Sequence, residues 1–303
     1  MKHIFIVNPA AGNGGAITEI TPAALKALKD KGDEYEIHRS LNKQEIHDYV
    51  RSRAESGEHI RFYACGGDGT INDVMCGLVG CPNAELAIVP CGSGNDFARN
   101  FTHQENFFNM EKQFNATLMD VDVIRAGETY AINMLNIGVD CDVVVAANAS
   151  RNKFIKGSGA YLVGVLKVLP RAKGYKMRYE LDDKVVEDEL FLAAVANGSY
   201  CGGGFKSSPV SELADGLIDV TIVRPVKGFK MLQMLLKYRQ GTHLEDKDAD
   251  LYINHFKCKK FSIEPLEEMY VSIDGEVNLF QPTEFEIMPK AVKLAIPEGS
   301  QLI

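Results

Sequence analysis

The chain has 303 residues, of which 46% are hydrophobic and 24% charged, and its formal net charge is −8. This composition indicates a soluble globular protein with the length of about two domains. The acidic balance argues against nucleic acid as a partner, because binding to a phosphate backbone needs a broad basic face. The seven cysteines form no Cys-x-x-Cys pair, which argues against a disulfide framework and against zinc.

No apolar run reaches the roughly 18 residues that a membrane-spanning helix needs. The first nine residues read as a strand that ends in a turn, and they lack the apolar core and cleavage site of a signal peptide. We therefore expect a cytoplasmic protein.

The first third of the chain alternates strand-like and helix-like segments. The expected strands are 3–7, 34–38, 60–64 and 86–90, and the expected helices are 17–31, 44–56 and one that begins after Thr70. This alternation is typical of a parallel sheet whose ligand loops lie at the carboxyl ends of the strands. Residues 1–120 are therefore predicted to form an α/β domain.

A different pattern follows from about residue 119, where short alternating strands are separated by turns. The expected strands are 121–125, 130–139, 176–181, 189–196, 216–224, 259–264 and 269–273. Two helical stretches interrupt them. We expect residues 121–289 to form a mainly antiparallel β-sandwich or barrel.

Three glycine-rich loops each follow a predicted parallel strand, at residues 8–15, 66–70 and 90–99. Glycines let the backbone approach a ligand closely, and the helix expected after Thr70 would direct N–H groups toward a phosphate. Asp68 would reach a polyphosphate through a cation, since a carboxylate and a phosphate repel each other. The spacing is not that of a Walker-type loop or of a dinucleotide-binding Gly-x-Gly-x-x-Gly loop. The alternative is a tight strand-to-helix turn without a ligand.

These loops and four later motifs resemble the bacterial diacylglycerol kinase and YegS-like lipid kinase family, which is related to sphingosine kinases. The motifs, in chain order, are Asn8-Pro9 with Gly12 and Gly14, residues 66–72, Pro90 with residues 92–99, Asn197-Gly198 with residues 202–204, Pro209, residues 215–219 and residues 274–276. The resemblance spans nearly the whole chain. It implies an ATP-binding α/β domain like that of phosphofructokinases and NAD kinases, a lipid-binding β-sandwich, and a tail over about 290–303 that returns to the first domain.

The resemblance also implies roles for individual residues. Those that would bind ATP are Asn8, Pro9, Gly12, Gly14, Ser40, Gly66, Gly67, Asp68, Gly69, Thr70, Ile71, Asn72, Gly92, Ser93, Gly94 and Asn95. Ser40 and Ser93 stand where many members have Thr, and both keep a hydroxyl. Asp68 is the candidate for the catalytic contact with Mg²⁺·ATP.

In this family, the element at residues 274–276 supplies the general base of a kinase. We favour Glu276 as the base and assign Asp274 to positioning or to a metal contact, while a plain Asp-Gly hairpin turn is the alternative. The family also holds a second, structural Mg²⁺. Carried over by position, its ligands would be the Asp215 carboxylate and the carbonyls of Glu212 and Leu217.

The segment from residue 151 to residue 178 has an unusual charge distribution, with eight basic residues and no acidic ones. These are Arg151, Lys153, Lys156, Lys167, Arg171, Lys173, Lys176 and Arg178. Its centre, 159–169, is apolar and predicted to be helical, and 228–240 again combines apolar with basic residues. Basic rims around apolar stretches suit an anionic bilayer. Core-packed helices with solvated lysines are the alternative.

The resulting hypothesis is a cytoplasmic kinase, peripherally bound to the inner face of the membrane, that uses ATP and Mg²⁺. It would transfer the γ-phosphoryl group to the hydroxyl of diacylglycerol or a related lipid. A soluble NAD kinase-like enzyme and a non-catalytic nucleotide or lipid sensor are the alternatives. A homodimer is compatible with the sequence, which does not fix the oligomeric state.

Overall fold

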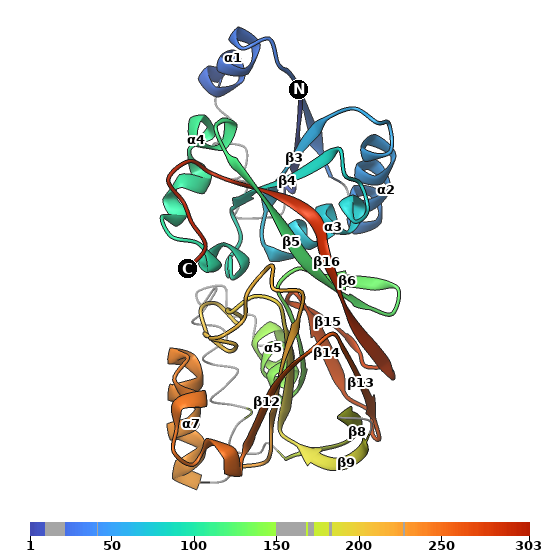
Figure 1. Ribbon diagram of the computed structural model, residues 1–303, viewed down its shortest axis with the longest axis vertical. Coiled ribbons are helices and arrows are strands. Elements are labelled where there is room, and N and C mark those ends of the chain that lie inside the picture. The colour runs from blue at the N-terminus through green and yellow to red at the C-terminus, as the bar shows by residue number, and fades with distance from the viewer. Residues whose placement is uncertain (10–21, 41, 150–167, 169–172, 182–183, 227) are drawn as a thin grey trace. The chain divides into compact units, whose positions relative to one another are not determined.

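A computed structural model describes residues 1–9, 22–40, 42–149, 168, 173–181, 184–226 and 228–303. The chain divides into two compact units (Figure 1). The N-terminal unit comprises Met1–Asp122 together with Lys290–Ile303, and the C-terminal unit comprises Val123–Pro289. The basic residues of the segment 151–178 lie outside the described residues except for Lys173, Lys176 and Arg178, and so does the expected helix at 159–169 except for Val168.

The N-terminal unit is built on a parallel sheet. Its strands are β1 (Lys2–Val7), β2 (Glu34–Arg39), β3 (Ile60–Gly66) and β4 (Ala84–Pro90), in the order β2-β1-β3-β4. The last part of β16 (Thr283–Ile296) pairs in parallel with β4 through Lys293 and Leu294. Every residue of β3 and β4 is buried, as expected for parallel strands that are covered on both faces.

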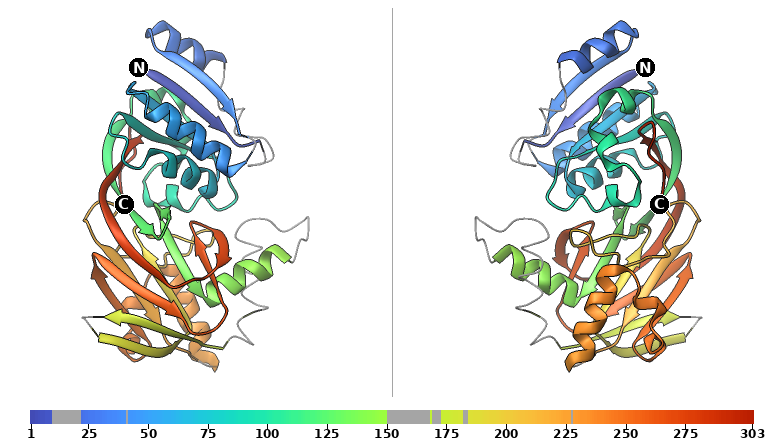
Figure 2. Two further views of the ribbon diagram at one scale, coloured as in Figure 1. Left: turned by 90° about the vertical axis from the view of Figure 1, so that its right-hand side faces the viewer. Right: turned by 90° about the vertical axis from the view of Figure 1, so that its left-hand side faces the viewer.

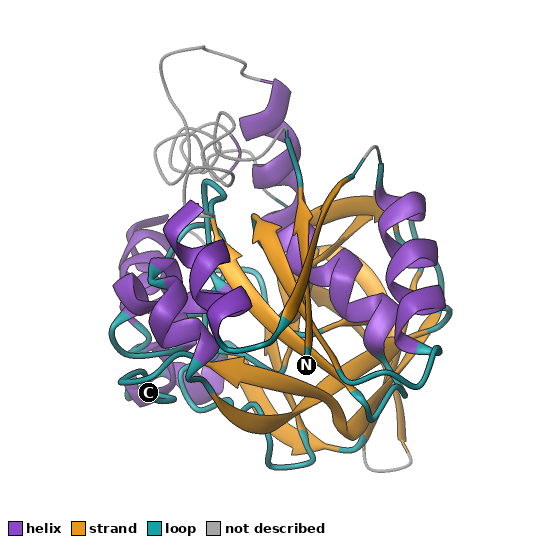
Figure 3. Ribbon diagram, turned by 90° about the horizontal axis from the view of Figure 1, so that it is seen from above, coloured by secondary structure: helices purple, strands orange, loops and turns teal. Residues whose placement is uncertain are grey.

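Helices cover both faces of this sheet (Figure 3). On one face, Leu28 of α1 (Pro22–Asp30) and Met110 of α4 (Met110–Phe114) join a cluster with Phe5 and Tyr63. Elsewhere α2 (Lys43–Ala54) and α3 (Asp68–Leu78) pack together. A side chain at Gly77 would lie 2.7 Å from a Val50 methyl group, so only glycine permits this close packing. Two short 3₁₀ helices, η2 (Phe97–Asn100) and η3 (Gln104–Phe108), follow β4.

The C-terminal unit is an antiparallel sandwich, as predicted. One sheet contains β12 (Ile253–Cys258), β11 (Ile218–Val223), β10 (Leu192–Ala196), β7 (Met134–Gly138), β14 (Tyr270–Ile273) and β15 (Glu276–Leu279), in that order. Opposite it, the first part of β16 pairs with β13 (Lys260–Pro265), followed by β8 (Tyr175–Leu181) and β9 (Lys184–Leu190). The hairpin of β5 (Thr117–Ala126) and β6 (Thr129–Ala131) adds Ile124 to the core.

Alternating residues of both sheets fill the sandwich core. Leu135, Val195 and Val220 come from the six-stranded sheet, and Tyr179 and Phe261 come from the other one. This alternation is the period-2 pattern that the sequence displays. Two expected strands are each divided in the structure. The segment 130–139 forms β6 and β7, and the segment 189–196 forms the end of β9 and β10.

Helices α5 (Val139–Ala149) and α7 (Gly228–Gln240) flank the six-stranded sheet (Figure 2). The chain passes from β7 into α5 at Gly138, where φ is +94° and an added Cβ would lie 2.7 Å from the Phe191 carbonyl oxygen. Only glycine fits there. Two short 3₁₀ helices, η5 (His243–Glu245) and η6 (Ala249–Leu251), follow α7. Within the described ranges, none of the helices has the length and apolar character to span a membrane.

Candidate functional site

Two of the glycine-rich loops meet backbone against backbone at the carboxyl ends of β3 and β4. An added Cβ at Gly92 would lie 2.4 Å from the Gly67 Cα, and one at Gly67 would lie 3.1 Å from the Gly92 Cα. The Cys91 N–H donates to the Gly66 carbonyl at 2.7 Å. A side chain at Gly66 would collide with Thr70, whose hydroxyl would lie 2.3 Å away. Close packing therefore requires glycine at positions 66, 67 and 92.

The first loop joins this cluster through Asn8. Its side-chain amide donates to the Thr70 hydroxyl at 3.0 Å, and its backbone N–H donates to the Cys65 carbonyl at 3.2 Å. Ser40 is buried, and its hydroxyl donates to the Val7 carbonyl at 3.3 Å. The Ser40 hydroxyl thus supports the end of β1 in this structure. Gly12 and Gly14 lie outside the described residues.

Helix α3 begins at Asp68, three residues before the expected position. Its N-cap, Gly67, offers no side chain, so no capping hydrogen bond satisfies the N–H groups of the first turn. Such N–H groups, at the positive end of a helix dipole, are suited to an anion. The side chain of Ile71 is fully buried, and Asn72 is nearly so. Both side chains are packed inside the N-terminal unit, like every residue of α3 from Thr70 to Leu78.

Asp68 ties the third loop to α3. Its Oδ1 accepts the N–H of Phe97 at 3.1 Å, while the Asn95 side chain, in a residue with φ +53°, accepts the N–H of Gly92 at 2.8 Å. Burial raises the pKa of the Asp68 carboxyl above its ordinary value, although the nearby N–H groups of Phe97, Asp96 and Asn95 act in the opposite direction. A carboxylate held out of water in this way favours a neighbouring cation.

In the C-terminal unit, Asp274 forms a clamp of hydrogen bonds. It lies in the two-residue turn between β14 and β15, with φ +44°, followed by Gly275 with φ +92°. Its Oδ2 accepts the N–H of Ile132 at 2.9 Å, and its Oδ1 accepts those of Asn133 at 3.1 Å and Met134 at 2.9 Å. The residue is 6% exposed. A hairpin turn is therefore present, and its carboxylate fixes the segment between β6 and β7.

The Asn197-Gly198 motif also forms hydrogen bonds with the segment between β6 and β7. The N–H groups of Asn197 and Gly198 both donate to the Asn133 carbonyl at 2.8 Å, and the Asn197 amide donates to the Ile132 carbonyl at 2.9 Å. Glu276 is the first residue of β15, directly after the turn, and is partly exposed. Two distant motifs of the sequence thus converge on 132–134, namely Asn197-Gly198 and Asp274, and the turn of Asp274 directly precedes Glu276.

The Asp215 motif has a different arrangement from the one the resemblance implies. Asp215 Oδ1 accepts the N–H of Leu217 at 3.0 Å, and Oδ2 accepts the ammonium group of Lys257 at 2.7 Å. The backbone group of Leu217 that faces the carboxylate is its N–H. Glu212 is exposed. Within the described part of the chain, no three His, Cys, Asp or Glu side chains gather in a way that could hold a metal ion.

Comparison with known proteins assigns the chain to a family. Residues 2–134 match the diacylglycerol kinase catalytic domain, and residues 133–296 match the YegS C-terminal NAD kinase beta sandwich-like domain. The chain belongs to the family of YegS-like and bacterial diacylglycerol kinases. The two matched domains together span residues 2–296.

Named relatives agree with this assignment. The chain is 28% identical over 262 residues to a Chromohalobacter salexigens protein named "Probable lipid kinase YegS-like", covering 84% of this chain and 83% of the relative. It is 26% identical over 302 residues to a Bacillus subtilis protein named diacylglycerol kinase, covering 98% and 97%. A crystal structure of a "putative diacylglycerol kinase" from Bacillus anthracis superposes with a TM-score of 0.79 at 28% identity, covering all of this chain and 96% of the other.

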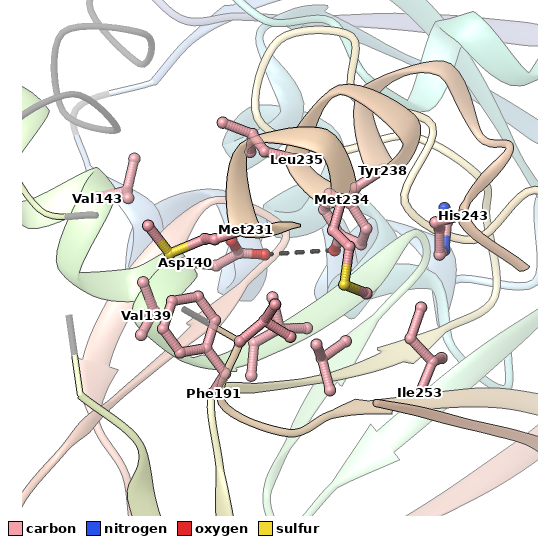
Figure 4. A pocket seen from close by; sticks show the side chains of 13 residues that line it. Val139, Asp140, Val143, Phe191, Met231, Met234, Leu235, Tyr238, His243 and Ile253 are labelled. Atoms are coloured by element: carbon pink, nitrogen blue, oxygen red, sulfur yellow. Dashed lines mark hydrogen bonds between the residues drawn. The ribbon is translucent and has the colours of Figure 1, made fainter. Parts of the chain in front are cut away.

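The sandwich unit of this lipid kinase family member also contains an apolar pocket that sequence reasoning missed (Figure 4). It lies between the outer face of the six-stranded sheet and helices α5 and α7. Its wall is formed largely by apolar side chains, among them Val139, Phe191, Met231, Met234, Leu235 and Ile253. The spacing of Met231, Met234, Leu235 and Tyr238 on one side of α7 is the signal that could have indicated this face.

Few polar groups reach the pocket. The Tyr238 hydroxyl donates to Asp140 Oδ2 over 3.4 Å, a long hydrogen bond that is drawn in Figure 4. His243 is 1% exposed, and burial lowers its pKa to about 4. The imidazole is therefore neutral at pH 7, so the pocket carries one carboxylate and no cation among its lining residues.

Proposed function

We propose that the chain is an ATP-dependent kinase that transfers the γ-phosphoryl group to the hydroxyl of diacylglycerol or a closely related lipid. The observation that carries this proposal is the apolar pocket of the sandwich unit, in a chain whose other unit gathers glycine-rich loops at a parallel sheet edge. A pocket lined by Phe191, Met231 and Leu235 suits the hydrocarbon chain of a lipid, because the transfer of apolar surface from water into an apolar pocket is favourable.

The phosphates of ATP would lie against the glycine-rich loops and the open N-terminus of α3. Asn8 and Thr70 already orient each other there, and Asp68 is the acidic group in that first turn. In nucleotide sites, Mg²⁺ is usually bound by one or two carboxylates together with the phosphates of the substrate. A single carboxylate, that of Asp68, is therefore sufficient. When bound, Mg²⁺ would neutralise part of the negative charge on the phosphoryl group during its transfer. Asp68 would hold that ion while the loop N–H groups orient the phosphates.

Glu276 would act as the general base. Both carboxylate oxygens of Asp274 accept hydrogen bonds from backbone N–H groups, three in all. Asp274 therefore positions the turn and is poorly placed to accept a further proton. The Glu276 carboxylate would take the proton of the lipid hydroxyl while the new oxygen–phosphorus bond forms and the bond to the ADP oxygen breaks. This division of labour supports the assignment made from the motif.

The pocket also bears on the alternatives. A soluble NAD kinase-like enzyme would need a place for a charged, hydrogen-bonding dinucleotide, whereas this pocket offers mainly aliphatic, aromatic and thioether groups. A non-catalytic sensor with this fold would still need the structural hydrogen bonds of Asp68 and Asp274, but it would not need the carboxylate at position 276. Both alternatives therefore explain fewer of the observed features than a lipid kinase does.

Peripheral membrane association is part of this proposal, and α7 is its candidate element. Its inner side lines the pocket, while Leu232 and Leu236, one turn apart on its outer side, are 49% and 52% exposed. The lysines of α7 are paired within the protein, Lys230 with Asp248 and Lys237 with Asp246, each at 2.8 Å. The outer side of α7 is thus suited to insert apolar side chains rather than to attract anionic lipid.

The proposal is tested by phosphoryl transfer. Purified protein is supplied with γ-labelled ATP and Mg²⁺, and with mixed micelles that contain diacylglycerol or other lipid alcohols, or with NAD⁺ in solution. We expect label in a diacylglycerol-type lipid. Label in NAD⁺ alone would favour the soluble kinase, and nucleotide binding without transfer to any acceptor would favour the sensor.

A further inference from the structure

We infer that Lys257 serves as a built-in cation at the Asp215 motif, in the position where the family resemblance places a structural Mg²⁺. The loop before β11 would then be held by an ammonium group of the chain itself. This inference does not rest on the proposed function, because it concerns only how the sandwich unit is stabilised.

The position of Lys257 is set by the sheet. It lies on β12, directly opposite Asp219 of β11 in the antiparallel register. From there its ammonium group reaches Asp215 Oδ2 at 2.7 Å and Asp219 Oδ2 at 3.4 Å. Cross-strand neighbours of opposite charge are mutually stabilising. One lysine therefore bridges the loop carboxylate and the strand carboxylate.

Burial makes this cation necessary. The Asp219 side chain is 1% exposed and that of Asp215 is 17% exposed, while Lys257 keeps 30%. A buried carboxylate without a compensating charge is strongly destabilising. His255 Nε2 lies 3.2 Å from Asp219 Oδ1, and its Nδ1 lies 3.0 Å from the Thr221 hydroxyl. If that hydroxyl donates to Nδ1, the ring proton is on Nε2 and faces Asp219.

A Mg²⁺ ion does not fit this arrangement. It would bind Asp215 at about 2.1 Å, yet Oδ2 already accepts the ammonium group and Oδ1 accepts the Leu217 N–H. A divalent ion on Oδ2 would lie within about 5 Å of the ammonium nitrogen and repel it. The ammonium group has three donors, so it can bind both carboxylates at once and offset part of their charge.

The test compares thermal unfolding with EDTA and with saturating Mg²⁺, in the absence of nucleotide. We expect the melting temperature of the wild type and of Asp215→Asn to respond identically to Mg²⁺, since any response then arises elsewhere in the protein. A stabilisation by Mg²⁺ in the wild type that Asp215→Asn abolishes would overturn the inference.

Substitution of the lysine provides the second arm. Lys257→Met should lower the melting temperature in EDTA by about 4–8 °C, and Mg²⁺ should restore part of it, because two facing carboxylates without the ammonium form a hard-cation site. Lys257→Arg keeps the charge and should remain independent of Mg²⁺. Lys260→Met is the matched control, since Lys260 pairs with Glu284 and Glu286 at an exposed position. An unchanged melting temperature in Lys257→Met would overturn the inference.

Discussion

The glycine-rich edge of the N-terminal unit and the pocket of the sandwich unit are built in opposite ways. At the edge, Gly66, Gly67 and Gly92 permit close packing because they have no side chain, and the contact between Gly67 and Gly92 is backbone against backbone. In the pocket, large side chains from β10, β11, β12, α5 and α7 form the wall. The first kind of site is encoded in short runs of sequence. The second depends on residues that only the tertiary fold brings together.

The two regions therefore differ in the substitutions that they tolerate. A backbone site fails when a single methyl group is added, because the opposing backbone cannot move away. A pocket lined by thioethers and branched side chains can repack around a changed neighbour. We therefore expect substitutions at the motif residues to affect turnover sharply, and those in the pocket to shift substrate preference by smaller factors.

The largest effect is expected at residues 274–276. Glu276→Gln removes the proposed base and should lower turnover by about a thousandfold, while ATP affinity stays close to wild type, because the base acts in the transition state. Single-turnover transfer and an equilibrium ATP-binding titration measure the two separately.

Asp274→Asn is the control for that comparison. An amide offers one acceptor oxygen where the carboxylate offers two, so the clamp on Ile132, Asn133 and Met134 is weakened. We expect a lower melting temperature together with a loss of activity. If Asp274→Asn abolishes transfer with unchanged stability and Glu276→Gln is mild, the two roles are exchanged.

The next effect concerns Asp68. Asp68→Asn keeps an oxygen that can accept the Phe97 N–H but removes the charge that would hold a cation. Turnover should fall by about a hundredfold or more, with little change in thermal stability. Near-normal turnover in the folded variant, measured with saturating Mg²⁺·ATP, would remove Asp68 from the metal role and leave it as a loop anchor.

The sequence predicted the fold class well because its determinants are local. The parallel strands β1 to β4 and the antiparallel sandwich follow from hydrophobic periodicity, and the fold class is confirmed. The start of α3 was placed three residues late, since Gly66, Gly67 and Gly69 around its N-terminus are poor helix formers. The division of 130–139 into β6 and β7 could not be read locally, because it follows from Asp274, more than a hundred residues away.

The pocket and the Lys257 bridge were not predicted for a related reason. Alternation along β11 and β12 indicates strands, but not which strands are neighbours, so the register that sets Lys257 opposite Asp219 is invisible in the sequence. In the same way, Phe191 and Met231 meet only after α7 has packed on the sheet. Side chains that act through long-range packing leave no motif of their own.

A moderate effect is expected in the pocket. Leu235→Gln places a polar amide in the apolar wall and should raise KM for a long-chain lipid about tenfold, in line with the transfer free energy of a buried leucine. KM for a short-chain analogue should change little. Leu251→Gln, at a residue of η6 that is 67% exposed and outside the pocket lining, is the matched control and should leave both values near wild type. Equal effects of the two substitutions would contradict the pocket as the acyl site.

The smallest effect is expected at the outer side of α7. Changing Leu232 and Leu236 together to Ser removes the two exposed leucines and should lower activity on lipid vesicles about threefold to tenfold, since partial burial of the two leucines in a bilayer is together worth about 1 kcal/mol. Activity on a short-chain soluble analogue should be unchanged.

Because Lys230 and Lys237 are paired with Asp248 and Asp246, the contribution of the two leucines to vesicle binding should depend little on salt. Co-sedimentation with vesicles at low and high ionic strength measures it. A loss that disappears at high salt would instead assign docking to charge, and a loss on both substrates would place these leucines in the fold rather than at the membrane.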